Sequence, residues 1–177
     1  MSLTAEIKKS LPSVDFTEKE SSPGDAELTV SKENIIELLS CLKNNLGFNH
    51  LADLTAYDDA ASSKNIFVVY ELINMNTKKR CRVQSPLDPQ DLKVESVCKL
   101  WSGANWLERE VFDMYGVIFN KHKDLRRLLL PPTFKGHPLR KDFVMDYRQD
   151  FSSDPQGEEV FDPFGHSVVS EKELGDI

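Results

Sequence analysis

The chain has few of the residue patterns that encode metal or cluster sites. Its three cysteines, Cys41, Cys81 and Cys98, lie 40 and 17 residues apart, and none forms a C-x-x-C pair. Its four histidines show no H-x-x-x-H or H-E-x-x-H spacing. These spacings predict neither a cysteine-ligated cluster nor a zinc site, and an odd number of cysteines is typical of a reducing compartment.

Nucleotide-binding, hydrolase and membrane-spanning patterns are also missing. The sequence contains no G-x-G-x-x-G, G-x-x-x-x-G-K-[ST] or G-x-S-x-G motif. No apolar run approaches the roughly 20 residues that span a bilayer. The amino terminus also has no long apolar core of a signal peptide. We therefore expect a cytosolic chain whose membrane association comes through partners.

What is present is the composition of one packed domain with extensions. The 177 residues are 40% hydrophobic and 29% charged, which is ordinary for a globular protein. Polar residues 1–25 end in a Ser-Ser-Pro-Gly stretch and predict a flexible lead-in outside the core. Residues 26–143 are expected to form the domain, and residues 144–177 an extended acidic tail that cannot pack a core alone.

Apolar spacing predicts helices and strands within the domain. Strands are expected at 27–30, 51–57, 65–74 and 77–85, with the last two forming a hairpin, and a brief edge strand is expected at 92–94. Apolar residues at helical spacing predict one helix that starts from an N-cap at Ser31 and a second over 103–115, ended by Gly116. The predicted fold class is α+β, a small mixed sheet with helices packed on one side.

Charge is distributed unevenly along the chain. Residues 105–141 carry eight basic and four acidic residues, a net of +4, whereas residues 142–177 carry two basic and ten acidic residues, a net of −8. A free nucleic-acid binder would rarely place an acidic tail beside its basic patch, because the tail competes with phosphate. Arginines set among apolar residues are instead typical of protein–protein interface cores.

The carboxylates of the second helix do not have the geometry of a catalytic pair. Glu108 and Glu110 point roughly 200° apart on a helix of 3.6 residues per turn, so they cannot converge on one substrate. Arg109 and Asp113 are four residues apart and are expected to pair along the helix surface. We therefore predict structural ion pairs and no catalytic residue in this segment.

A compound motif over residues 106–143 resembles the C-subunit family, also called the "30 kDa" subunit family, of NADH:quinone oxidoreductase, respiratory complex I. The residues that carry the resemblance are Glu108-Arg109-Glu110, Asp113-Met114-Tyr115-Gly116, Phe119, His122, Leu125-Arg126-Arg127-Leu128 and Gly136-His137-Pro138-Leu139-Arg140-Lys141-Asp142-Phe143. The resemblance implies an interface role for the charged and histidine positions of this motif.

The resemblance also implies a non-catalytic scaffold on the peripheral arm, at the cytoplasmic face of the membrane. Its partners would be the quinone-site large subunit and the cluster-bearing subunits of a hetero-oligomeric membrane complex. Iron–sulfur clusters, quinone and, where NADH is the donor, FMN and NADH would be bound by those partners, and this chain would bind no cofactor. The tail at 144–177 would lie on a partner subunit.

Two alternatives stay open. The chain could be the equivalent subunit of a ferredoxin-, F420H2- or plastid-type quinone oxidoreductase or of an energy-converting hydrogenase, since the electron donor binds elsewhere. More distantly, the same arginines could serve a free-standing RNA- or phosphate-binding module, although no nucleic-acid partner is expected.

Overall fold

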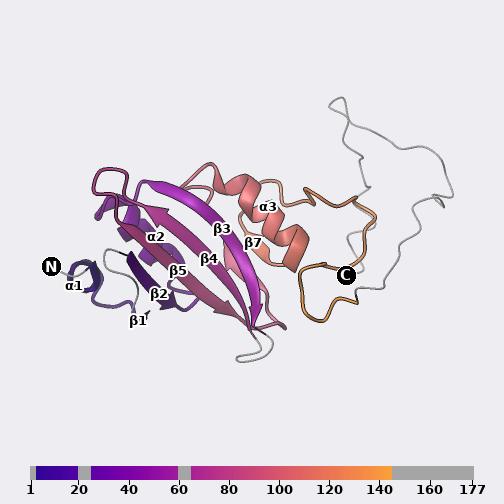
Figure 1. Ribbon diagram of the computed structural model, residues 1–177, viewed down its shortest axis with the longest axis horizontal. Helices are drawn as coiled ribbons and strands as arrows, with labels where there is room; N and C mark the ends of the chain where they lie inside the picture. The colour runs from indigo at the N-terminus through magenta and orange to yellow at the C-terminus, as the bar shows by residue number, and fades with distance from the viewer. Residues whose placement is uncertain (1–2, 20–24, 60–64, 145–177) are drawn as a thin grey trace.

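Alternating apolar residues build a five-stranded mixed sheet (Figure 1). The structure is a computed structural model and describes residues 3–19, 25–59 and 65–144. Neighbouring strands pair antiparallel except β2 with β5, which run parallel. The sheet order is β1 (Phe16–Lys19), β2 (Asp25–Val30), β5 (Arg80–Leu87), β4 (Asn65–Ile73), β3 (His50–Asp59). The α+β class and the β4–β5 hairpin are confirmed.

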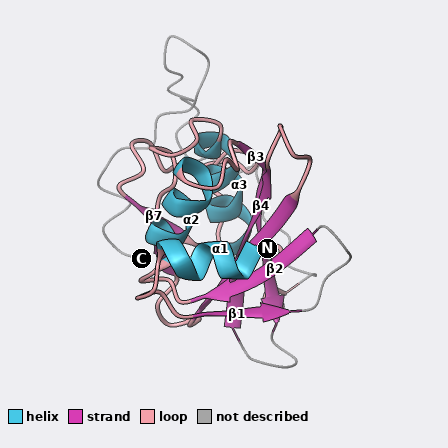
Figure 2. Ribbon diagram, turned by 90° about the vertical axis from the view of Figure 1, so that its left-hand side faces the viewer, coloured by secondary structure: helices cyan, strands magenta, loops and turns pink. Residues whose placement is uncertain are grey.

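The inner face of the sheet is apolar and carries the helices. Leu28, Val83, Tyr70 and Leu54 stand opposite one another on four neighbouring strands, and all four are buried. The helix α2 (Ile35–Asn44) adds Ile35, Leu38, Leu39 and Leu42 to the same core. Figure 2 shows the helices gathered on one side of the strands, as predicted.

The start of α2 differs from the prediction. The N-cap is Asn34, and its side chain makes no capping hydrogen bond. Residues 32–34 form a turn instead, closed by the Asn34 N–H donating to the Ser31 carbonyl at 3.1 Å. Ser31 therefore precedes this turn and does not cap the helix.

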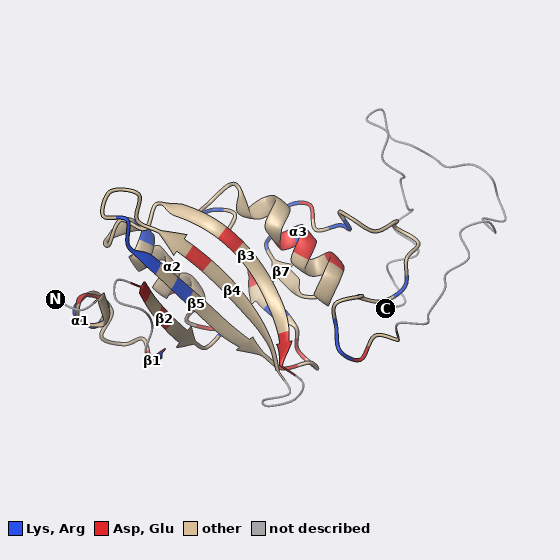
Figure 3. Ribbon diagram, viewed as in Figure 1, with Lys and Arg blue, Asp and Glu red and all other residues tan. Residues whose placement is uncertain are grey.

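The outer face of the sheet carries a row of charges that crosses every strand. Lys19, Glu27, Arg82, Glu71 and Asp53 occupy successive register positions. Lys19 meets Glu27 at 3.6 Å, and Arg82 meets Glu71 at 2.5 Å. The hairpin arginine is thus matched by an acidic neighbour within the sheet, and the mixed charge is visible in Figure 3.

The expectation that residues 1–25 lie outside the core was wrong. Residues 3–10 form α1 (Leu3–Ser10), and β1 pairs with β2. Ile7 is fully buried and Val14 is 5% exposed. Ile7 and Val14 belong to the core, and the partly buried Leu3, Leu11 and Phe16 pack against it. The helix is only eight residues long, so its apolar spacing is too short to be recognised in the sequence.

The helix α3 (Ala104–Tyr115) and a small second sheet extend the domain beyond β3. β6 (Lys93–Glu95) pairs parallel with β7 (Ile118–Asn120), and α3 connects them and packs against β3. The helix ends at Gly116, whose φ of 77° is left-handed. Residues 121–144, here called the strap, follow β7 without a helix or strand (Figure 1).

No helix within residues 3–19, 25–59 and 65–144 is long and apolar enough to cross a bilayer. The predicted acidic tail falls, from residue 145 onward, outside the described residues.

Candidate functional site

The site centres on Asp113, which fastens the strap to α3. The Asp113 side chain is fully buried. One carboxylate oxygen accepts the backbone N–H groups of Leu128, Leu129 and Leu130 at 3.0, 2.7 and 2.9 Å. The other accepts Nη1 of Arg127 at 2.7 Å. Burial raises the pKa of Asp113, but these donors together outweigh it and hold the pKa below its ordinary value.

Arg127 links the helix to two parts of the strap. Besides Asp113, its guanidinium donates to the Gly136 carbonyl at 3.1 Å. The same group lies 5.8 Å from the centroid of the Phe134 ring. Its side chain is only 16% exposed, so Arg127 acts within the fold.

Arg109 also turns to the strap, which corrects its predicted pairing with Asp113. Its Nε and Nη2 donate to the carbonyls of Arg126 and Arg127 at 3.2 and 3.1 Å. Its guanidinium lies 5.1 Å from the Trp106 ring centroid. Backbone carbonyls of the strap that are shielded from water need hydrogen-bond donors. Arg109 supplies two such donors, and Asp113 pairs with Arg127 instead.

His137 fills the space left by Gly116. Its Nδ1 lies 3.0 Å from the Asp113 carbonyl oxygen, which only accepts, so Nδ1 donates. A Cβ on residue 116 would lie 2.7 Å from the His137 ring. Burial, with the nearby Arg127 and Arg140, lowers the pKa of His137 against the opposing hydrogen bond. A neutral imidazole is therefore favoured here.

Of the remaining basic residues of the motif, Arg126 and Lys141 are exposed, whereas the side chain of Arg140 is 23% exposed. Arg126 pairs with Asp124 at 3.1 Å, and Arg140 pairs with Asp142 through two bonds of 3.1 and 3.0 Å. Lys141 is exposed, while its backbone N–H donates to Asp58 at the end of β3 at 2.9 Å. Exposed pairs of this kind contribute little to folding, and their charges remain accessible to a partner. Figure 3 shows basic residues recurring along the strap.

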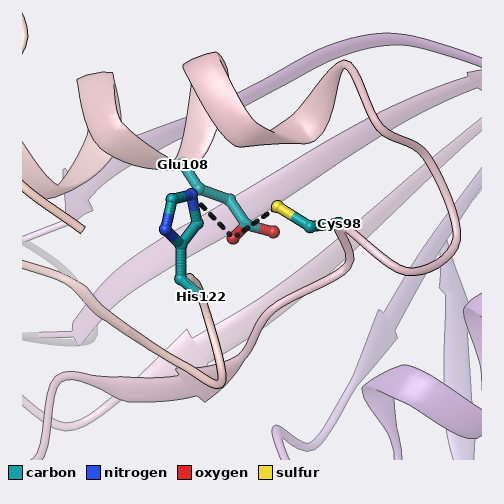
Figure 4. A group of neighbouring side chains, drawn as sticks. All are labelled: Cys98, Glu108 and His122. Atoms are coloured by element: carbon teal, nitrogen blue, oxygen red, sulfur yellow. Dashed lines mark hydrogen bonds and ion pairs between the residues drawn. The ribbon is translucent and has the colours of Figure 1, made fainter. Parts of the chain in front are cut away.

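Glu108 and Glu110 lie on different sides of α3, as the helical spacing predicts. Glu110 is exposed and Glu108 is fully buried. Glu108 accepts the Val97 N–H at 2.7 Å, and its other oxygen lies 3.5 Å from Cys98 Sγ and 4.0 Å from His122 Nε2 (Figure 4). Burial raises the pKa of the Glu108 carboxyl. Cys98 was not predicted here, because residues ten and fourteen positions apart form no recognisable motif.

Three large apolar side chains near α3 are exposed. Trp106 is 58% exposed, Leu129 62% and Leu139 50%. The Leu129 N–H is held by Asp113, and the Leu139 N–H donates to the Met114 carbonyl at 3.1 Å. The strap is thus fastened to α3 by its backbone, while these leucine side chains stand outward. We call Trp106, Leu129 and Leu139 the apolar row.

A family model described as "Respiratory-chain NADH dehydrogenase, 30 Kd subunit" matches residues 28–149. The chain belongs to this family. It is 43% identical over 122 residues to the C-subunit of NADH-quinone oxidoreductase from Citrifermentans bemidjiense, covering 69% of this chain and 76% of that protein. The match to the 30 Kd subunit family includes α2, α3, the sheet from β2 onward and the strap.

Solved structures share the fold. A trypsin-resistant fragment of Nqo5 is 27% identical, with a TM-score of 0.59, over 70% of this chain and 96% of the fragment. A chain of the membrane-bound sulfane sulfur reductase, an archaeal respiratory membrane complex, has a TM-score of 0.68 over 81% of this chain and 84% of its own. That chain is 24% identical, so it supports the fold alone.

Proposed function

We propose that the chain is a non-catalytic scaffold subunit on the peripheral arm of a proton-translocating NADH:quinone oxidoreductase. The observation that carries the proposal is its membership of the 30 Kd subunit family over residues 28–149. On this proposal the redox cofactors and the quinone belong to partner subunits. The chain joins the membrane complex through those partners, at its cytoplasmic face.

The strap supplies the docking surface. Its shape is set within the subunit, because Asp113, Arg109 and Arg127 bind its backbone. Along the chain, the exposed Leu129 follows Arg126, and the exposed Leu139 precedes Arg140 and Lys141, so apolar and cationic side chains alternate along the strap, a combination found at interface cores. A partner with an apolar surface and carboxylates around it fits this face.

The division of the arginines refines the role of the signature residues. Arg109 and Arg127 shape the strap, whereas Arg126, Arg140 and Lys141 are placed to meet the partner. Glu108 and Asp113 are buried on α3, the strap residues His122 and His137 contact α3, and Glu110 and Asp142 are exposed.

The test is assembly in the native host. Leu129→Ser and Leu139→Ser remove exposed apolar area without touching the core, so the free subunit should fold while incorporation into the complex falls several-fold on native gels. The control is Met75→Ser, which changes another exposed apolar residue, 47% exposed and in the turn after β4. Normal assembly of both leucine variants would overturn the docking role.

A second candidate is the equivalent subunit of a complex with another electron donor. It stays open because the residues of this chain do not identify the electron donor, which on either proposal binds to another subunit. Mass spectrometry of the complex co-purified with this chain separates the two. An NADH-binding flavoprotein in the complex favours the first proposal, and its absence from a complete complex favours the second.

A further inference from the structure

The buried group formed by Cys98, Glu108 and His122 brings together three different metal-binding side chains (Figure 4). They come from the turn before α3, from α3 itself and from the strap. Sγ of Cys98, a carboxylate oxygen of Glu108 and a ring nitrogen of His122 all lie within 4.8 Å of one another. The side chains of Glu108 and His122 have no exposed surface.

Of the direct contacts among these groups, only the one from the Cys98 thiol to Glu108 Oε2, at 3.5 Å, is a hydrogen bond. His122 Nε2 lies 4.0 Å from Glu108 Oε2, which is too long for a hydrogen bond. A zinc ion bound at about 2.0 Å to oxygen and about 2.3 Å to sulfur in tetrahedral geometry places those two atoms about 3.5 Å apart. The Cys98 Sγ to Glu108 Oε2 distance is 3.5 Å. The imidazole would move inward, to about 3.3 Å from the oxygen.

The donor set selects the kind of ion. Thiolate sulfur and imidazole nitrogen favour zinc over magnesium or calcium, which take oxygen ligands. Three protein ligands leave a fourth position for water, and Cys98 is only partly buried, so water has access. The second oxygen of Glu108 is held by the Val97 N–H at 2.7 Å, the supporting contact that orients a ligating carboxylate.

Binding would change the hydrogen bonds of His122. The Asp124 N–H donates to Nδ1 at 3.0 Å, so the proton is on Nε2, which faces the Asn105 carbonyl at 3.2 Å. Zinc on Nε2 displaces that proton, the ring then carries its proton on Nδ1, and the Asp124 N–H turns to water. The Cys98 thiol proton also leaves to solvent. The cost is three hydrogen bonds, from His122 to the Asn105 carbonyl, from the Asp124 N–H to His122 and from the Cys98 thiol to Glu108, set against three metal bonds.

We propose that Cys98, Glu108 and His122 bind one Zn²⁺ with water at its fourth position, and that this ion ties the turn before α3 and the base of the strap to α3. The site is independent of the proposed function, since it concerns the subunit by itself. Its spacing matches no zinc motif, so only the fold brings the ligands together.

The experiment uses Co²⁺ as a spectroscopic probe on the purified, untagged full chain. We expect one Co²⁺ per chain, a thiolate-to-cobalt absorption band, and displacement of that band by Zn²⁺. Cys98→Ser should abolish the band, whereas Cys41→Ser, which changes a buried cysteine outside the group, should keep it. Glu108→Gln should weaken binding about tenfold or more.

Two results would overturn the proposal. One is a folded wild-type chain that shows no thiolate band with Co²⁺. The other is a band that persists unchanged in Cys98→Ser, which would place the thiolate elsewhere. Neither result bears on assembly, so failure of the zinc site leaves the docking test intact.

Discussion

At Asp113, one buried carboxylate receives three consecutive backbone amides and a guanidinium. Such an arrangement resembles the anion-binding geometry of successive N–H groups, with the carboxylate as the anion. The anion belongs to the helix and the amides to the strap. The path of the strap over residues 128–130 therefore depends on the charge of a single side chain.

Asp113→Asn keeps the size of this side chain but removes its charge and turns one acceptor into a donor. We expect faster hydrogen exchange at the amides of Leu128, Leu129 and Leu130. The free energy needed to open the strap from α3 should fall by about 3–5 kcal/mol. Exchange in β4 should stay unchanged, because the strap adds little to the main core. Mass spectrometry of deuterated peptides measures both. Equal acceleration across the whole chain would contradict a local role.

The same carboxylate predicts a pH dependence. The folded-state pKa of Asp113 is held below its ordinary value. Its contribution is therefore complete above the pKa of the unfolded chain and is lost as the pH falls through the folded pKa. Amide NMR shifts of residues 128–130 should change in acid, below the usual aspartate range. The corresponding shifts of Asp113→Asn should not titrate there.

Gly116→Ala tests two costs at one position. The left-handed φ of 77° costs an alanine about 1–2 kcal/mol, and the new Cβ would lie 2.7 Å from the His137 ring. We expect a loss of unfolding free energy above about 2 kcal/mol. In the double variant Gly116→Ala, His137→Ala, the part of the loss due to the steric clash should disappear, while the cost of the left-handed backbone remains. Urea denaturation of the two single variants and of the double variant measures this difference. If the losses of the single variants simply add in the double variant, the two residues do not contact each other.

The sequence predicts the faces of α3 correctly but not the partners of its charges. Helical geometry separates Glu108 from Glu110 without any knowledge of the fold. Asp113 pairs with Arg127 and not with Arg109 because of the path that the strap follows. No periodic pattern in the sequence predicts that path. For the same reason, Cys98 could not be placed beside Glu108 from spacing alone.

At the scale of elements, α2, α3 and the β4–β5 hairpin are the parts that the sequence predicts well. Each has several apolar residues at one spacing. α1, β1 and the parallel pairing of β2 with β5 are different, because they depend on contacts with distant segments. Short elements with one or two buried residues carry too little signal to be recognised in a single sequence.

Ile7→Ala tests whether α1 belongs to the domain. Ile7 is fully buried, so truncation should lower the unfolding free energy by about 2–5 kcal/mol. Lys9→Ala, which changes an exposed residue of the same helix, should alter it by less than about 0.5 kcal/mol. Urea denaturation followed by circular dichroism gives both values. An unchanged midpoint for Ile7→Ala would mean that α1 is dispensable.

At the scale of the whole molecule, the cationic block is less available than its net charge suggests. Arg109 and Arg127 are occupied by Asp113 and by backbone carbonyls, so these two guanidinium groups cannot also bind phosphate. This argues against a free-standing nucleic-acid binder, which needs unpaired cations along a phosphate path.

The isolated chain should therefore not shift RNA in an electrophoretic assay at physiological salt. A basic protein of similar size serves as the positive control. Salt-sensitive retention that is lost in an Arg126→Ala, Lys141→Ala double variant would instead support phosphate binding by the strap, because these two side chains are exposed.

The parallel pairing of β2 with β5 also bears on biosynthesis. Residues 25–30 emerge from the ribosome long before residues 80–87. In the sheet order β2 lies between β1 and β5, so its edge toward the centre of the sheet has no strand to pair with until β5 has been synthesised. Among the described strands, β1 pairs with β2 alone. The β1–β2 edge of the sheet must therefore wait for the hairpin and is completed late in translation.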